Sequence, residues 1–139
     1  MVDADVVARK LLSLNEALRE LQRPEAANVA SLTGDPVLRA AVERWLQVAV
    51  EACIDIGFHV VASEGWTPPQ SARASFLSLA AHGKLALELA QRLGLAASLH
   101  NVLVHDYALL DLERVAKVVR DDLGDLRLFA AAAAGWIEA

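Results

Sequence analysis

The chain of 139 residues contains only one cysteine, one methionine and one tyrosine. The single cysteine, Cys53, excludes an internal disulfide, and its place within a helical run predicts a small buried residue. The sequence shows no charged-then-apolar leader, and we find no uninterrupted apolar stretch of the roughly 20 residues that cross a bilayer. These absences predict a soluble, cytoplasmic protein without a membrane partner.

Basic and aromatic residues are also scarce. Lys and Arg number 13 against 18 Asp and Glu, and the resulting net charge of −5 argues against a broad nucleic-acid surface, leaving room only for a local cationic cleft. Aromatic residues make up 5% of the chain, whereas hydrophobic residues as a whole reach 55%. The composition favours closely packed helices, so we predict one all-α domain over residues 1–139. The apolar surplus predicts an oligomer, most simply a symmetric homodimer.

The N-terminal half is predicted to form two long helices. The first runs from Asp5 to Leu21 on an apolar periodicity of three and four residues and ends near Pro24. The segment from Arg23 to Gly34 is interpreted as a connector. Asp35-Pro36 then supplies an N-cap and a first helical residue for a second helix with two apolar faces, which we expect to be buried centrally.

The C-terminal half is predicted to form shorter helices. The segment Gly65-Trp66-Thr67-Pro68-Pro69 ends the second helix, because prolines remove backbone donors. Gly83 and Gly94 are expected to divide the following region. The predicted helices are Ser71–Ala81, Leu95–Asp106, Leu112–Asp122 with Asp111 as N-cap, and Leu126–Ile137.

Polar residues that could carry chemistry gather in His100-Asn101-Val102-Leu103-Val104-His105-Asp106-Tyr107. In a helix, Asn101 and His105 share one face, whereas His100 and His105 diverge by about 140°. Two copies related by a two-fold axis would place four imidazoles around one cleft. Imidazoles titrate near neutrality, so they can move protons at a ribose hydroxyl and a leaving oxygen without a metal.

A structural role for these histidines is the competing interpretation, since a histidine on an apolar helix is more often a hydrogen-bonded structural residue. A zinc site is disfavoured, because one buried cysteine and no His-x-x-x-His pair leave too few ligands. Of the remaining histidines, His59 is expected to pair with Asp55, and His82 to end a short helix beside Gly83.

The octapeptide resembles the motif Arg-Asn-x-x-x-His-x-Tyr of the HepT-like proteins in the HEPN superfamily. Flanking segments support the resemblance in the expected order, so that it covers nearly the whole chain. These segments are Val42-Glu43-Arg44-Trp45-Leu46-Gln47, Cys53-Ile54-Asp55-Ile56-Gly57-Phe58-His59 and Phe76-Leu77-Ser78-Leu79-Ala80.

The resemblance implies an up-and-down helical bundle of four to six helices that forms a homodimer. It implies a toxin that acts as a metal-independent endoribonuclease at the dimer cleft, needs no cofactor and cleaves tRNA or mRNA. His105 would be the general acid/base, and Asn101 and His100 would contact phosphate. A nucleotidyltransferase antitoxin would silence the toxin by transferring AMP to Tyr107, where charge and bulk oppose RNA binding.

The sequence departs from the family motif at position 100, where histidine replaces arginine. Arginine is permanently charged and bidentate, so the replacement is expected to weaken phosphate binding and activity. Three explanations stay open: His100 is a second acid/base group, it marks natural loss of nuclease activity, or it is an inactivating substitution. The alternative functions are accordingly a weak or inactive partner subunit that binds a nucleotidyltransferase, and a helical dimerisation module with structural histidines.

Overall fold

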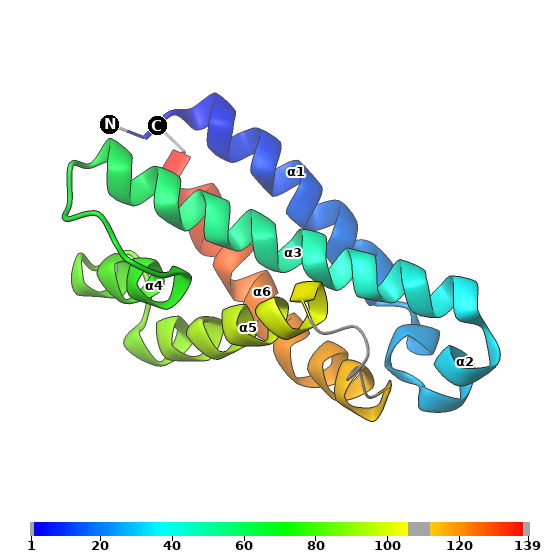
Figure 1. Ribbon diagram of the computed structural model, residues 1–139. Coiled ribbons are helices and arrows are strands. Elements are labelled where there is room, and N and C mark those ends of the chain that lie inside the picture. Colours follow the sequence, from blue (N-terminus) through cyan, green and yellow to red (C-terminus); the bar gives the residue numbers. More distant parts are fainter. Residues whose placement is uncertain (1, 106–111, 138–139) are drawn as a thin grey trace.

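The computed structural model describes the backbone of residues 2–105 and 112–137, and the side chains of residues 2–98 and 112–137. Within these ranges the chain forms helices and no strand (Figure 1), which confirms the all-α helical bundle. The helices are α1 (Ala4–Leu21), the 3-10 helix η1 (Pro24–Ala27), α2 (Val29–Gly34), α3 (Pro36–Ser63), α4 (Ala72–Ala81), α5 (Leu87–His105) and α6 (Leu112–Ile137).

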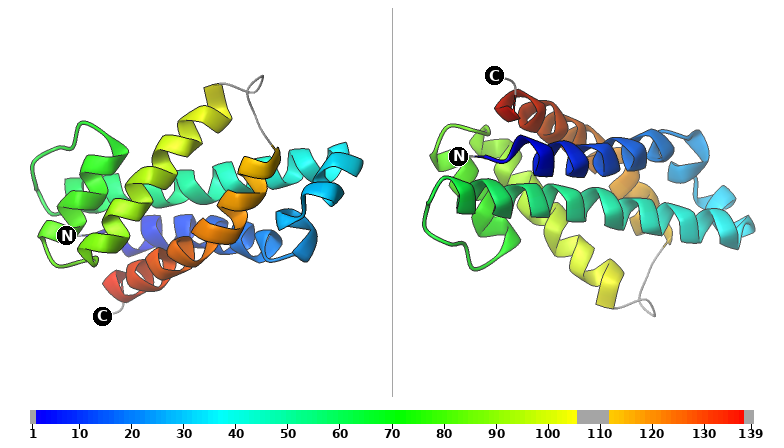
Figure 2. Two further views of the ribbon diagram at one scale, coloured as in Figure 1. Left: turned by 90° about the horizontal axis from the view of Figure 1, so that it is seen from below. Right: turned by 90° about the horizontal axis from the view of Figure 1, so that it is seen from above.

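The long helix α3 organises the bundle. α1 runs beside α3 along much of its length and also packs on α6, whereas α4 and α5 pack on each other and on α3 (Figures 1 and 2). Phe76 of α4 and Phe129 of α6 meet edge to face with their ring centroids 5.8 Å apart. The core therefore joins the C-terminal helices to the pair formed by α1 and α3. Its largest fully buried side chains include Leu14, Leu21, Leu46, Ile56, Phe76, Leu79, Leu93 and Phe129.

The segment predicted to be a connector is folded, so that prediction is wrong in part. Pro24 begins η1, and the Asn28 side chain caps α2 by accepting a hydrogen bond from the Ser31 backbone N–H at 3.0 Å. Leu32 of α2 is only 1% exposed. Both helices are too short to show a hydrophobic period, and burial of a few side chains, such as Ala26 and Leu32, holds them against the bundle.

The start of α3 is confirmed as predicted. One carboxylate oxygen of Asp35 accepts hydrogen bonds from the backbone N–H groups of Val37 and Leu38, both at 3.1 Å, and Pro36 occupies the first turn. We expect Asp35→Ala to lower the free energy of unfolding by about 0.5 to 2 kcal/mol, because it leaves two backbone donors without this acceptor. Urea denaturation of the two proteins measures the difference. Asp35→Asn, which keeps an acceptor, should retain most of the stability; equal losses in both variants would contradict the capping role.

Helix α3 is long and apolar enough to cross a membrane by length and composition. The sequence prediction concerns an uninterrupted apolar run, whereas charged residues such as Glu51 and Asp55 interrupt α3. Core helices of soluble bundles share these properties, and half of the most apolar part of α3 is buried inside the protein. Because α1, α4, α5 and α6 all pack on it, α3 has the central position that its two apolar faces predict.

Two predicted helix breaks are absent. α5 continues through Gly94, and α6 runs unbroken through Gly124 instead of forming two helices. A glycine within a helix costs only about 1 kcal/mol relative to alanine, which the packing of a long helix can outweigh. Gly83, by contrast, has a φ of +76° and follows the end of α4, as predicted.

The isolated cysteine and histidine predictions have different outcomes. Cys53 is buried, as expected, and its burial raises the pKa of the thiol. The predicted pairing of His59 with Asp55 is wrong: His59 Nε2 accepts a hydrogen bond from the Asp3 backbone N–H at 3.2 Å. Asp55 instead pairs with Lys10 at 3.1 Å, because α1 lies beside α3.

His82 ends α4 beside Gly83, as predicted. Its ring stacks on Trp66 with centroids 3.6 Å apart and an interplanar angle of 6°, and its Nδ1 lies 2.8 Å from the Ser78 carbonyl oxygen. These contacts connect the end of α4 to the loop that follows α3. His82 therefore has a packing role at the end of α4, and it lies far in sequence from the polar cluster.

Candidate active site

Helix α5 carries three of the four candidate residues. His100, Asn101 and His105 lie in its last two turns, so the helical conformation predicted for this stretch is confirmed. Asn101 and His105, four residues apart, occupy adjacent turns on one side of the helix, whereas His100 is displaced around the axis. Tyr107 and the predicted N-cap Asp111 lie outside the described residues.

The C-terminal turns of α5 extend away from the rest of the bundle. Both views in Figure 2 show this end of the helix projecting past α3. The first part of α5 is anchored by Leu89, Ala90 and Leu93, all of which are buried in the core. The candidate residues thus follow a helical segment that is fixed by the core.

A cavity of about 390 Å³ lies beside the middle of α5, between this helix, α3 and the beginning of α4. The residues of α5 that line it are Gly94, Ala97 and Ser98. Asn101 follows Ala97 by one helical turn, and His105 follows Asn101 by another. The row of α5 residues that borders the cavity therefore continues into the two motif positions.

Arg73 is the cationic residue of this cavity. Its side chain crosses α5 at Gly94, since a β-carbon added at Gly94 would lie 2.9 Å from Cγ of Arg73. Gly94 is needed here for this close approach rather than for an unusual backbone angle. Ser71, which also lines the cavity, caps α4 by accepting a hydrogen bond from the Ala74 backbone N–H at 3.0 Å.

The α3 wall of the same cavity is acidic. It includes Glu51, which is half-buried, and Asp55, whose charge is offset by the ion pair with Lys10 at 3.1 Å. The cavity therefore has a carboxylate side on α3 and a guanidinium side on α4. An anionic ligand is favoured only near Arg73.

A second cavity, of about 400 Å³, lies between α5 and α6. Its lining combines the cations Arg114 and Lys117 with the carboxylates of Asp121 and Asp122 and the exposed side chain of Leu95. The pKa of Asp122 is raised by burial and by the nearby charges of Asp125 and Asp121, while Lys117 opposes the shift. Mixed charge makes this cavity a weaker anion site than the Arg73 side of the first.

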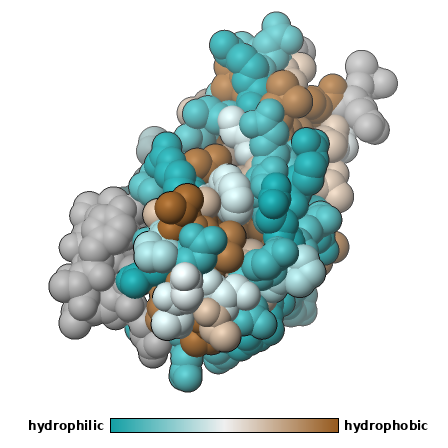
Figure 3. All heavy atoms as spheres, turned by 90° about the vertical axis from the view of Figure 1, so that its right-hand side faces the viewer, coloured by the Kyte–Doolittle hydropathy of each residue, from teal (hydrophilic) through white to brown (hydrophobic). Residues whose placement is uncertain are grey.

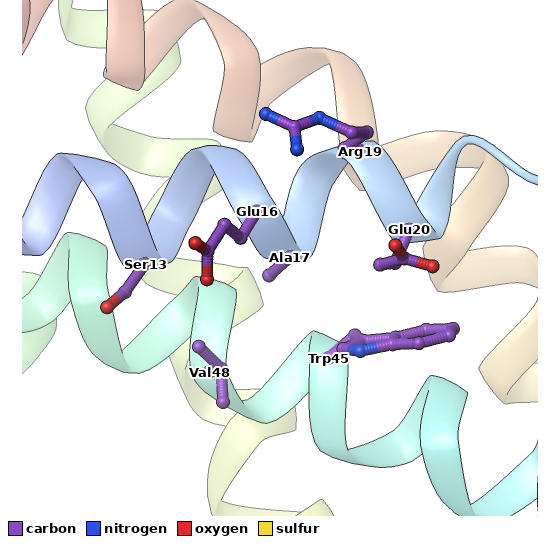
Figure 4. Close-up of a pocket in the computed structure, with 7 residues that line it drawn as sticks. All are labelled: Ser13, Glu16, Ala17, Arg19, Glu20, Trp45 and Val48. Atoms are coloured by element: carbon purple, nitrogen blue, oxygen red, sulfur yellow. The ribbon is translucent and has the colours of Figure 1, made fainter.

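A third cavity, of about 530 Å³, follows the groove between α1 and α3 (Figure 4). Glu16 and Glu20 of α1 stand above Trp45 and Val48 of α3, and Glu20 pairs with Arg23 at 2.7 Å. Arg19 also lines this groove, and Arg23 offsets the charge of Glu20. Its mixed charge therefore makes it a weak site for a phosphodiester.

The end of the bundle formed by α2 and the start of α3 offers no broad apolar surface. In the face shown in Figure 3, hydrophobic side chains are interspersed among hydrophilic ones. Val37, which is 80% exposed, is the most exposed large apolar residue among those described. Among the described residues, no three His, Cys, Asp or Glu side chains gather in a way that could hold a metal ion.

Arg73 is not among the residues that the sequence predicts for the site. Its signal is weak, because a lone arginine in the first turn of a short helix is typical of any solvated surface. Only the fold brings α4 across Gly94 of α5, more than 20 residues further along the chain. The nearest sequence signal is Gly94 itself, which predicts a helix break rather than a close approach of two helices.

Comparisons with known proteins agree with this fold. Residues 14–133 match the family model described as Ribonuclease HepT-like. The chain is 31% identical over 125 residues to the mRNA nuclease HepT of Shewanella oneidensis, and the match covers 90% of this chain and 93% of that protein.

Two solved structures are similar to the whole bundle. A tri-AMPylated HEPN toxin of Shewanella oneidensis in complex with its MNT antitoxin matches with a TM-score of 0.84 and 30% identity, covering 94% of this chain and 98% of that one. The cytosolic protein YutE of Bacillus subtilis, of unknown function, matches with a TM-score of 0.87 over 99% of this chain and 92% of its own. At 15% identity, the second likeness concerns the fold alone.

Proposed function

Because this chain belongs to the HepT-like ribonuclease family, we propose that it is the toxin of a HEPN/MNT toxin–antitoxin system and cleaves RNA. The observation that carries the proposal is the family match over residues 14–133, which includes the α5 turns with Asn101 and His105. The related nuclease is named for cleavage of mRNA, so mRNA is the first substrate to test, followed by tRNA. We place the reaction in the cytoplasm.

The proposed active site forms in a homodimer, where the projecting ends of two α5 helices meet across the two-fold axis. His105 takes the proton of a ribose 2′-hydroxyl, whose oxygen attacks the adjacent phosphorus. The bond from phosphorus to the 5′-oxygen breaks, and that oxygen receives a proton from another imidazole of the dimer cleft. The reaction needs no metal or cofactor, and it leaves a 2′,3′-cyclic phosphate and a 5′-hydroxyl.

Asn101 and His100 contact the phosphate in this proposal. Asn101 donates neutral hydrogen bonds, which position the group without changing its charge. His100 adds positive charge only in its protonated form, whereas the arginine usual in the family would always be charged. The proposal therefore predicts a slower enzyme than relatives that carry the arginine.

Tyr107 is the proposed site of control by the antitoxin. The related toxin is AMPylated and bound to an MNT antitoxin, which supports a cognate nucleotidyltransferase as the partner of this chain. AMP on the tyrosine would bring a negative phosphodiester and a bulky nucleoside two residues from His105. Both effects oppose entry of an RNA phosphate into the cleft.

We expect incubation with the cognate nucleotidyltransferase and ATP to add AMP to Tyr107 and to abolish RNA cleavage. Peptide mass spectrometry locates the added mass, and gel analysis of an mRNA transcript follows the activity. Tyr107→Phe, which lacks the acceptor oxygen, should stay active after the same treatment. Modification elsewhere, or silencing of Tyr107→Phe to the same degree, would overturn the assignment of Tyr107.

A second candidate function is a partner subunit with little or no nuclease activity of its own. The observation that favours it is His100, which stands where the family motif has an arginine, whose charged guanidinium is expected to hold phosphate. In that case the chain would bind the nucleotidyltransferase through the same cleft. Absence of RNA cleavage by both the unchanged chain and His100→Arg would favour this candidate.

A further inference from the structure

We infer that Arg73 binds a phosphate of the RNA strand outside the cleaved bond, in the cavity between α3, α4 and α5. The inference rests on the proposed function and extends it, because it adds a subsite on an element outside the motif. The bound group is a phosphodiester of single-stranded RNA. Arg73 is thus a substrate-binding residue and takes no part in proton transfer.

The geometry of α4 and α5 fixes the position of Arg73. Its Cγ lies so close to Gly94 that a β-carbon there would approach it to 2.9 Å, so the stem of the side chain lies directly on the backbone of α5. The residue is nevertheless exposed, and its guanidinium forms no ion pair with the described parts of the chain. Arg73 thus has an aliphatic part that is held in place and a permanently charged guanidinium without an ion pair among the described residues, and this combination suits a phosphate ligand.

The register of α5 connects this cavity to the motif. Asn101 lies seven residues beyond Gly94, which corresponds to roughly 10 Å along the helix axis, and His105 lies roughly 16 Å from Gly94. Ala97 and Ser98, which line the cavity, lie on α5 between Gly94 and Asn101. An RNA strand that passes along this side of α5 would therefore meet Arg73 before it reaches the motif.

The charges around the cavity place the phosphate on its α4 side. Asp55 is paired with Lys10 at 3.1 Å, which reduces its repulsion of an anion. Glu51 also lies on the α3 wall and directs the phosphate away from that side. On the α4 side, the oxygen of Ser71 accepts a backbone hydrogen bond, and its hydroxyl hydrogen is available to a second acceptor.

The test is equilibrium binding of a short single-stranded 2′-O-methyl RNA, which cannot be cleaved by 2′-hydroxyl attack. We expect Arg73→Ala to weaken binding by about 10- to 100-fold, the loss typical of a charge-assisted contact. The slope of log affinity against log salt should fall by about 0.7, the value for one phosphate contact on a single strand. Arg73→Lys should show an intermediate affinity and retain the slope, because it keeps the charge without the fork.

Arg127→Ala is the matched control, because Arg127 is an exposed arginine of α6 that lines none of the three cavities. It should bind RNA like the unchanged chain. Equal affinities and salt slopes for Arg73→Ala and the unchanged chain would overturn the subsite and leave the nuclease proposal intact. A chain that binds no RNA at all would overturn both, and circular dichroism of each variant verifies that the helices are intact.

Discussion

Replacing His105 by alanine is expected to lower the rate of RNA cleavage by about 10²- to 10⁴-fold, the usual contribution of a positioned general acid or base. Asn101, on the same side of the helix, cannot substitute for it, since its side chain does not titrate near neutrality. The measurement is the single-turnover rate on an mRNA transcript. The fold should be unchanged, because His105 lies in the projecting last turn of α5.

His82→Ala is the appropriate control for this prediction. His82 is exposed at the end of α4, where it stacks on Trp66, so its loss removes an imidazole without touching the proposed cleft. We expect it to cleave like the unchanged chain. If His82→Ala and His105→Ala retained the same activity, the assignment of His105 would be wrong, and a structural role for the motif histidines would be favoured.

His100→Arg is expected to raise the cleavage rate by about 10²- to 10³-fold, the magnitude associated with one preorganised donor to a transition-state oxyanion. Arginine supplies two parallel donors and a charge that does not depend on pH. The single-turnover rate should also become less dependent on pH between 6 and 8, where imidazoles with ordinary pKa values lose their charge (roughly 6.5 for histidine). His100→Lys, with charge but no fork, should give a smaller gain.

The outcome of this substitution separates a catalytic His100 from a histidine that weakens the site. A large gain means that the histidine is a weakening replacement for arginine. A loss of activity means that His100 itself moves a proton in the reaction. No cleavage by either protein would contradict the nuclease proposal for this chain and would favour the partner-subunit alternative.

Local signals in the sequence were sufficient to predict several boundaries of the fold. Asp35-Pro36 marks the start of α3 through a cap and a residue without an N–H group, and both effects depend on adjacent residues alone. The break predicted at Gly94 is wrong, because the small local cost of a glycine is outweighed by packing along a long helix. The two helices predicted over residues 112–137 are one helix, α6. Packing also decides the partner of Asp55, since Lys10 reaches it only where α1 lies beside α3.

The candidate site, like the fold, could be predicted from the sequence only in part. The motif could be located because its residues are contiguous in sequence and resemble the Arg-Asn-x-x-x-His-x-Tyr motif of the HepT-like proteins, whereas the helical spacing of Asn101 and His105 alone does not distinguish a catalytic from a structural role. The subsite could not, since Glu51, Arg73 and Ser98 come from three helices and acquire a common cavity only after folding. A residue such as Arg73 has no sequence signal that separates it from other surface arginines.

The most direct test of the nuclease account is the chemistry of the RNA ends. The purified chain, freed of antitoxin, is incubated with an mRNA transcript in excess EDTA, and the fragments are analysed for their terminal groups. Attack by the 2′-hydroxyl predicts fragments with 5′-hydroxyl and 2′,3′-cyclic phosphate ends, in amounts unchanged by EDTA. Fragments with 5′-phosphate and 3′-hydroxyl ends, or cleavage that disappears when EDTA is added, would contradict it.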